Sequence, residues 1–165
     1  MNNPFTKWHA NDWALTLCLV CGAMLATGIY LEYVVGLDPC PLCMMQRVWF
    51  LLTGAIAYGS LLHNPRWGIY PVLSGTTATI GGYFSAKQLW LQSLPADQVP
   101  SCGPNLDYMI DAFPLADIIV AMTQATGDCA EITWSLIGIS IPGWALLGFV
   151  ALLAGSVLQL HAASR

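Results

Sequence analysis

The sequence has few charged residues: Asp, Glu, Lys and Arg make up only 8% of its 165 positions. Soluble globular domains carry about 25% charged residues. With 56% hydrophobic residues and a mean hydropathy of +0.62, this chain cannot cover its surface with groups that face water. Five Lys and Arg against nine Asp and Glu also leave little to bind a phosphate backbone. These shortages exclude a soluble domain, a disordered chain and a nucleic-acid-binding protein, and they predict an integral membrane protein.

The few charges and the prolines divide the chain into candidate membrane spans. Four stretches contain no Asp, Glu, Lys or Arg, namely 13–31, 48–65, 67–86 and 132–164. A spanning helix needs about 20 mostly apolar residues, and proline disrupts a helix interior. Together the two patterns predict a single membrane domain over 1–165, an all-α bundle of four transmembrane helices. The predicted helices span approximately 13–31, 45–63, 70–90 and 143–161.

Four spans place both termini on one side of the membrane and two loops, approximately 32–44 and 91–142, on the other. Basic residues favour the cytoplasmic side. The side of the termini carries Lys7, Arg66 and Arg165, and the loop side carries Arg47 and Lys87. We therefore expect cytoplasmic termini and periplasmic loops.

The second loop contains one helical pattern. Leu115, Ile118, Ile119 and Met122 recur at helical spacing, directly after Pro114. This short amphipathic helix either lies on the membrane surface or packs on the loop itself.

Four of the six cysteines fall in the two predicted loops. Cys40 and Cys43 form a C-x-x-C motif in the first, and Cys102 and Cys129 lie in the second. An even number of thiols outside the cytosol suggests disulfides. C-x-x-C alone is typical of redox pairs, zinc sites and haem attachment. Met44 stands where haem attachment needs His, and neither loop holds a His for zinc, so the pattern favours redox chemistry over a metal site.

The residues around the motif favour a reactive Cys43. Pro41 suits the first position of a helix, which places Cys43 in the first turn, where a helix N-terminus favours the thiolate. Arg47 follows one turn later on the same face and would favour the thiolate further. The alternative for Arg47 is a side chain that merely extends to the membrane interface. A second C-x-x-C, Cys18 and Cys21, lies inside the first span, where cysteine behaves as a small hydrophobic residue.

Several motifs together resemble the disulfide bond formation protein B (DsbB) family. They are Cys40-Pro-Leu-Cys43 with Gln46-Arg47, Gln88-Leu-Trp-Leu-Gln92, Pro100-Ser-Cys102-Gly-Pro, Gly127-Asp-Cys129-Ala-Glu131 and Pro142-Gly-Trp144. The match covers nearly the whole chain in order.

The resemblance implies an enzyme of the bacterial inner membrane that reoxidises a periplasmic DsbA-like thiol oxidase and passes the electrons to a quinone, ubiquinone or menaquinone. It further implies that the partner attacks a Cys102–Cys129 disulfide at Cys102, that Cys40 and Cys43 receive the electrons, and that Arg47 lies near the quinone. Lys87 stands where the family leads us to expect a basic or histidine side chain, and its role stays open.

Two other interpretations fit the layout. A vitamin K epoxide reductase-like protein also pairs C-x-x-C with quinone, but its motif is expected near the last helix of the catalytic bundle rather than at the start of the second. A membrane scaffold with structural or metal-binding cysteines is the non-enzymatic alternative.

Overall fold

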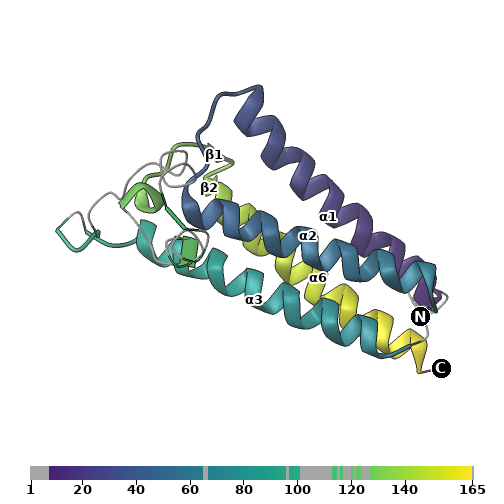
Figure 1. The fold of residues 1–165 in the computed structure, drawn as a ribbon. Coiled ribbons are helices and arrows are strands. Elements are labelled where there is room, and N and C mark those ends of the chain that lie inside the picture. Colours follow the sequence, from purple (N-terminus) through teal and green to yellow (C-terminus); the bar gives the residue numbers. More distant parts are fainter. Residues whose placement is uncertain are drawn as a thin grey trace.

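The computed structural model describes residues 8–64, 67–95, 97–100 and 127–164, together with 113, 114, 116, 120, 122 and 123. Long helices carry most of these residues and run alongside one another (Figure 1). They are α1 (Ala10–Tyr33), α2 (Pro41–Leu62), α3 (Ile69–Gln92) and α6 (Ile141–Ala163). The mostly helical architecture predicted from the sequence is confirmed, and α1 and α6 are each long and apolar enough to cross a membrane.

The helices extend beyond most of the limits that the charge gaps predicted. α1 begins at Ala10 rather than 13 because Asp12, in its first turn, accepts a hydrogen bond of 2.8 Å from the backbone N–H of His9. α2 begins at Pro41 rather than 45 and α6 at Ile141 rather than 143, each with proline in the first turn. Capping groups and first-turn prolines set these helix ends. The spacing between charged residues does not reveal such signals, so it placed the helix starts too late.

The segment before α6 contains short elements that the sequence pattern did not predict. η2 (Gly127–Ala130) is one turn of 3₁₀-helix. β1 (Ser135–Leu136) and β2 (Ile139–Ser140) form an antiparallel hairpin in which Ser135 pairs with Ser140. In Figure 1 the hairpin lies at the end of the bundle where α1 ends and α2 begins.

The predicted amphipathic helix of the second loop falls mainly outside the described residues, which include only Met122 of its apolar stripe. Met122 packs against the buried cluster that contains Leu42, Phe84 and Cys129. This contact favours packing on the protein over membrane contact at that one position.

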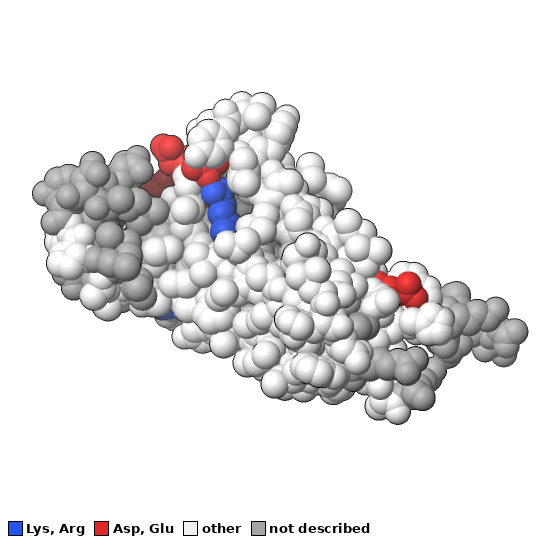
Figure 2. Space-filling model, turned by 45° about the vertical axis from the view of Figure 1, so that its right-hand side comes forward, with Lys and Arg blue, Asp and Glu red and all other residues white. Residues whose placement is uncertain are grey.

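The bundle buries polar side chains and exposes apolar ones. The buried polar residues are Gln46, Thr53, Ser60, Ser74, Ser85, Gln88, Ser156 and Gln159. Every long helix also directs large apolar residues outward, among them Leu19, Leu51, Val72 and Val150. On the face in Figure 2, charged side chains gather towards the two ends of the bundle and the middle is uncharged. This pattern reverses that of a soluble protein and is typical of helices that meet lipid outside and small or polar residues inside.

α3 and α6 pack closely against each other at Gly81. A Cβ on Gly81 would lie 2.2 Å from the ring of Phe149, so α6 approaches α3 only because Gly81 has no side chain. The Phe149 ring stacks on Phe50 of α2 with ring centroids 3.9 Å apart. The Phe149 ring therefore contacts α2 through Phe50 and α3 through Gly81.

Candidate active site

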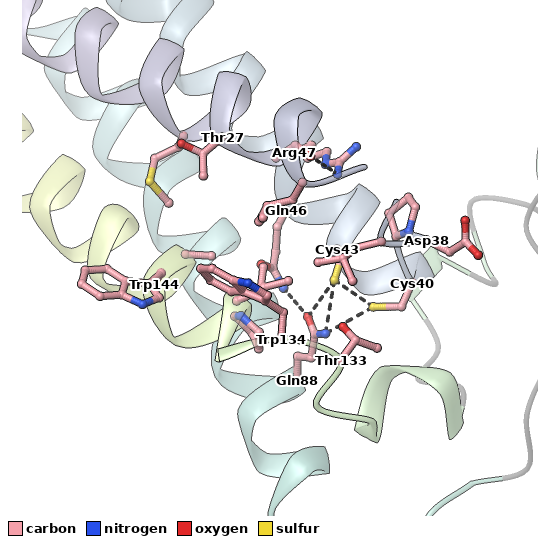
Figure 3. A pocket seen from close by; sticks show the side chains of 18 of the residues that line it. Thr27, Asp38, Cys40, Cys43, Gln46, Arg47, Gln88, Thr133, Trp134 and Trp144 are labelled. Carbon is pink, nitrogen blue, oxygen red and sulfur yellow. Dashed lines mark hydrogen bonds between the residues drawn. The ribbon is translucent and has the colours of Figure 1, made fainter. Parts of the chain in front are cut away.

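The cysteines of the first predicted loop lie at the start of α2. Cys40 is the N-cap residue and Pro41 occupies the first turn, which places Cys43 in that turn as predicted. The backbone N–H of Met44 donates to the carbonyl of Cys40 over 3.1 Å and closes the turn. The Cys40 thiol therefore lies 2.9 Å from the sulfur of Cys43, in hydrogen-bond contact (Figure 3).

An amide from α3 holds both sulfurs. Nε2 of Gln88 donates to Cys40 Sγ over 3.2 Å and to Cys43 Sγ over 3.3 Å. The Gln88 side chain is oriented by Gln46, whose Nε2 donates to Gln88 Oε1 over 2.7 Å. That bond orients the Gln88 amide so that its Nε2 donates to both sulfurs, while its oxygen lies farther from Cys43 Sγ, at 3.7 Å, as Figure 3 shows.

Cys129 of the second predicted loop reaches the same cluster. It lies in η2, is fully buried, and packs among Leu42, Phe84 and Leu91. Its sulfur is hydrogen-bonded to Cys40, which therefore contacts both Cys43 and Cys129. The fold thus brings together three of the four predicted redox cysteines. The fourth, Cys102, lies outside the described residues.

These contacts divide the roles of the two C-x-x-C thiols, both of which precede residue 45, where the predicted span begins. Hydrogen bonds to Cys129 and Cys43, followed by burial, raise the pKa of Cys40 above its ordinary value. The hydrogen bond from Cys40 is the largest cause that lowers the pKa of Cys43, and Gln88 lowers it further. Two thiolates side by side are disfavoured, so of the two thiols Cys43 loses its proton more readily.

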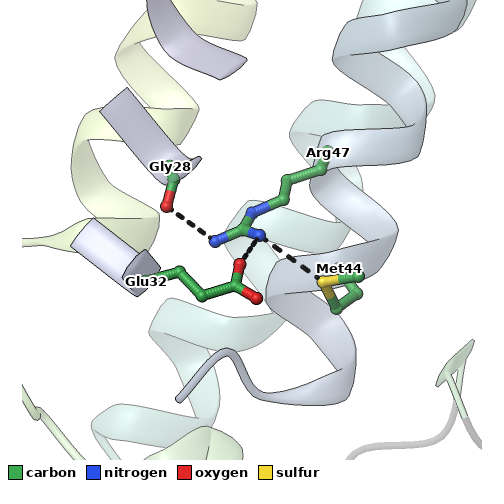
Figure 4. A network of polar contacts seen from close by, with 4 residues as sticks. All are labelled: Gly28, Glu32, Met44 and Arg47. Carbon is green, nitrogen blue, oxygen red and sulfur yellow. Dashed lines mark hydrogen bonds and ion pairs between the residues drawn. The ribbon is translucent and has the colours of Figure 1, made fainter. Parts of the chain in front are cut away.

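Arg47 makes different contacts from those that the sequence predicted. Its Nη1 pairs with the carboxylate of Glu32 and its Nη2 donates to the carbonyl of Gly28 over 2.9 Å, both on α1 (Figure 4). A weaker contact of 3.7 Å joins Nη1 to the sulfur of Met44. The pKa of Cys43 is lowered, in the direction that the sequence predicted, and the causes are hydrogen bonds from Cys40 and Gln88 rather than the charge of Arg47.

A cavity of about 320 Å³ opens beside this cluster, with Cys40, Cys43, Arg47 and Gln88 on its wall. The rest of the lining comes from all four long helices, the segment between α1 and α2, and the segment before α6, and it is mostly apolar apart from a few polar residues that include Asp38, Asp128 and Glu131. It includes Met24, Leu31, Phe50, Trp134, Leu136, Pro142, Trp144 and Ala145. A flat, largely apolar molecule with a few polar oxygens fits such a lining.

The comparisons with known proteins agree on one family. The family described as "Disulfide bond formation protein DsbB" matches residues 10–159. "Disulfide bond formation protein B" of Hahella chejuensis is 44% identical over 151 residues, which cover 89% of this chain and 92% of that protein. The protein of the same name from Marinobacter nauticus is 46% identical over 138 residues, 82% of each chain. "Disulfide bond formation protein B 1" of Pseudomonas aeruginosa is 44% identical over 144 residues, 86% of this chain and 88% of that protein.

This chain belongs to the DsbB family. Membership makes it a membrane oxidoreductase that generates disulfides, as the sequence motifs implied. In this DsbB family member, Cys40 and Cys43 are joined by a hydrogen bond, and Cys129 of the second predicted loop is hydrogen-bonded to Cys40.

The remaining predicted residues of this DsbB family member lie apart from the sulfurs. Lys87 of α3 donates from Nζ to the carbonyl of Thr123 over 2.8 Å and so ties α3 to the second loop. Cys18 donates to the carbonyl of Gly54 over 3.8 Å, and Cys21 is buried in the bundle core. Within the described part of the chain, no set of three or more His, Cys, Asp or Glu side chains is arranged so that it could hold a metal ion.

Sequence reasoning missed the roles of Gln46 and Gln88, although both belong to the motifs it singled out. A signal was present. Glutamine is costly inside an apolar helix of a membrane protein unless its amide is satisfied within the bundle. Two such residues on neighbouring predicted helices therefore indicate an internal hydrogen bond, and here that bond orients the amide that holds the thiols.

Proposed function

We propose that this protein reoxidises a DsbA-like thiol oxidase of the periplasm and passes the electrons to a quinone of the bacterial inner membrane. The observation that carries the proposal is the contact of Cys129, Cys40 and Cys43 beside one apolar cavity. A structural disulfide needs two sulfurs. Three sulfurs in hydrogen-bond contact instead allow disulfide exchange between two loops.

The proposed setting is a bundle of four spans with both termini in the cytoplasm. α2 and α3 have 22 and 24 residues and direct large apolar side chains outward, as α1 and α6 do. At about 1.5 Å per residue, each is long enough for a hydrocarbon core of about 30 Å. The start of α1 and the end of α6 lie at one end of the bundle and the cysteines at the other, which supports redox loops on the periplasmic side (Figure 1).

The proposed relay begins when a thiolate of the reduced partner attacks Cys102 in a Cys102–Cys129 disulfide. The second thiol of the partner resolves the mixed disulfide, and the partner leaves oxidised. Cys129 then attacks Cys40 in the Cys40–Cys43 disulfide and releases the Cys43 thiolate. A lower thiol pKa makes a better leaving group, so the lowered pKa of Cys43 suits this step. Cys102 finally closes on Cys129 and leaves Cys40 and Cys43 reduced.

The cavity beside Cys43 fits a quinone. Its lining offers apolar surface for the ring, and Arg47 and Gln88 supply polar N–H groups at the wall. A bound quinone accepts the two electrons and two protons that Cys40 and Cys43 release as their disulfide re-forms. An acceptor of this kind is needed because DsbA is itself a strong oxidant, near about −120 mV. Its reoxidation by a typical structural disulfide, below about −300 mV, is uphill by roughly 8 kcal/mol.

Cys102→Ala in the purified protein tests the relay. We expect the variant to lose turnover with a reduced DsbA-like protein, since the Cys102–Cys129 disulfide that the partner attacks can no longer form. Its Cys40–Cys43 pair should still be oxidised by added quinone, which mass spectrometry after thiol alkylation measures. Normal oxidation of the partner by this variant would overturn the order of the relay.

A further inference from the structure

The hairpin before α6 presents an apolar tip that nothing in the relay uses. Leu136 pairs with Ile139, so Ile137 and Gly138 alone form the turn. The hairpin is held firmly from two sides. Trp144 donates from Nε1 to the carbonyl of Leu136 over 3.3 Å, and Ser140 donates to Oε1 of Gln92 over 2.8 Å. The tip is therefore fixed to the first turn of α6 and the end of α3.

The turn keeps an unfavourable residue at its tip. Ile137 has φ of 56° and Gly138 has φ of 76°. Two-residue hairpin turns with two positive φ angles strongly prefer Asn-Gly or Asp-Gly, and a β-branched residue at positive φ is strained. Isoleucine at this position accepts strain that asparagine would avoid, so its side chain must serve something other than the turn.

The Ile137 side chain is also the most exposed large hydrophobic side chain among the described residues, at 85%. Its neighbour Leu136 is 48% exposed, and Ile132 is 60% exposed. No charged residue occurs from 132 to 164. An exposed isoleucine that is held in a strained turn within an uncharged segment indicates that its side chain contacts an apolar environment outside the protein.

The position of the tip identifies that environment. β2 runs directly into α6, an apolar helix that can cross a membrane, with no linker between them. The tip is therefore only a few residues from the start of a span, and Trp144, bonded to the hairpin, is a residue type enriched at membrane interfaces. α6 itself also has exposed large apolar side chains, such as Leu147 and Val150.

We propose that the tip formed by Leu136 and Ile137 inserts into the lipid bilayer at the interface where α6 enters it. Leu136 also lines the cavity beside Cys43. Insertion of the tip would therefore keep the edge of the cavity at Leu136 within the apolar layer of the membrane, where a quinone dissolves. This second consequence rests on the proposed function, whereas insertion itself does not.

Depth measurement tests insertion without any enzymatic activity. A spin label is attached through Ile137→Cys in a variant whose six native cysteines are replaced, reconstituted in phosphatidylethanolamine–phosphatidylglycerol vesicles. Labels at Leu19→Cys, exposed in the middle of α1, and Gln98→Cys, in the polar loop, provide the lipid and water references. We expect the label at 137 to be accessible to dissolved oxygen and protected from an aqueous nickel chelate, as at 19.

A nickel accessibility at 137 equal to that at 98 would overturn insertion. Protection that arises only after a reduced DsbA-like protein is added would assign the tip to a protein interface and would equally overturn the proposal.

A pair of variants with all native cysteines tests the consequence for the cavity. Ile137→Asn relieves the strained turn but removes the apolar side chain, whereas Ile137→Leu keeps an apolar side chain. In proteoliposomes we expect Ile137→Asn to raise the apparent quinone KM severalfold with an unchanged or higher Tm, and Ile137→Leu to keep the KM.

An unchanged KM in Ile137→Asn would overturn the role of the tip at the cavity. A lowered Tm with unchanged KM would show that the side chain serves stability instead. If the protein does not reduce quinone at all, the proposed function fails, while the depth measurement still decides insertion.

Discussion

At the scale of single residues, the chemistry depends on which of two adjacent thiols holds the proton. The Cys40 thiol donates to Cys43, and Gln88 donates to both sulfurs. Hydrogen-bond donors favour the charged form of the sulfur that accepts from them. Cys43 accepts from both Cys40 and Gln88, so the thiolate forms more easily at Cys43 than at Cys40. Gln46 contributes indirectly, because its hydrogen bond to Gln88 Oε1 orients the amide whose Nε2 donates to both sulfurs.

Replacing Gln88 should raise the pKa of Cys43. Gln88→Leu removes a hydrogen bond to a charged group, worth about 1.5–3 kcal/mol, and should slow alkylation of Cys43 at neutral pH by roughly tenfold. Because the thiolate is the reactive form, activity falls as the pH drops through the lowered pKa of Cys43. In the variant this fall should begin at a higher pH. Alkylation of Cys43 in the reduced protein, followed by mass spectrometry across pH, measures both effects.

Gln159→Leu is the matched control for this experiment. Gln159 is an equally buried glutamine, and its Nε2 donates to Ser60 over 3.0 Å. It should alter stability without changing the alkylation of Cys43. Equal alkylation profiles for Gln88→Leu and the unchanged protein would show that Gln88 does not lower the pKa of Cys43.

At the scale of elements, the contact between α1 and α2 positions Arg47. The guanidinium lies against the backbone of α1, where it pairs with Glu32 and donates to Gly28. A Cβ on Gly28 would lie 3.1 Å from Arg47 Nε, closer than ordinary contact. Gly28 therefore allows the arginine of one helix to rest on the other at the wall of the cavity, as Figure 4 shows.

Gly28→Ala should displace Arg47 and weaken quinone use. We expect the apparent quinone KM to rise severalfold at a fixed concentration of reduced partner, with a smaller change in kcat. Gly22→Ala, on the same helix, is the control, because a Cβ at Gly22 would meet nothing within 4 Å. Its KM should not change. If both variants keep the original KM, the position of Arg47 does not matter for the acceptor, and the arginine serves only as an interfacial residue.

At the scale of the whole molecule, the distribution of polarity favours a membrane position for the entire bundle. Buried Ser, Thr and Gln side chains join the helices internally, and large apolar side chains cover the outside. Without a hydrophobic drive between helices in lipid, association depends on close packing and internal hydrogen bonds. The contact of Gly81 with Phe149 is an example of such close packing. The hydrogen bond of 2.9 Å between the Thr53 and Thr77 hydroxyls is an example of an internal hydrogen bond.

The proposed orientation predicts opposite labelling of the two ends. In a variant without native cysteines, Gln98→Cys should react with a membrane-impermeant maleimide added to spheroplasts. Asn64→Cys, between α2 and α3, should react only after the membrane is permeabilised. The reverse pattern would place the redox end in the cytoplasm, and labelling of both positions from outside would contradict a spanning bundle.

The sequence by itself determined the class of protein and most of its long elements. The shortage of charge required a membrane environment, because too few polar side chains exist to cover a soluble surface. Charge gaps and prolines located the helices, since both features act locally on a helix. Pro41 and the C-x-x-C spacing placed Cys43 in the first turn of α2 for the same reason.

Only the tertiary structure decided which distant residues meet at the site. Cys129 reaches Cys40, and Gln88 reaches both C-x-x-C sulfurs, through contacts between segments far apart in the chain. Arg47 was predicted to act on Cys43 from one turn away, but the carboxylate of Glu32 on another helix holds it instead. The hairpin tip was also not predicted, because its pattern contains none of the usual turn residues except Gly138. Local spacing fixes which face a side chain occupies, while the partner on that face depends on how the helices pack.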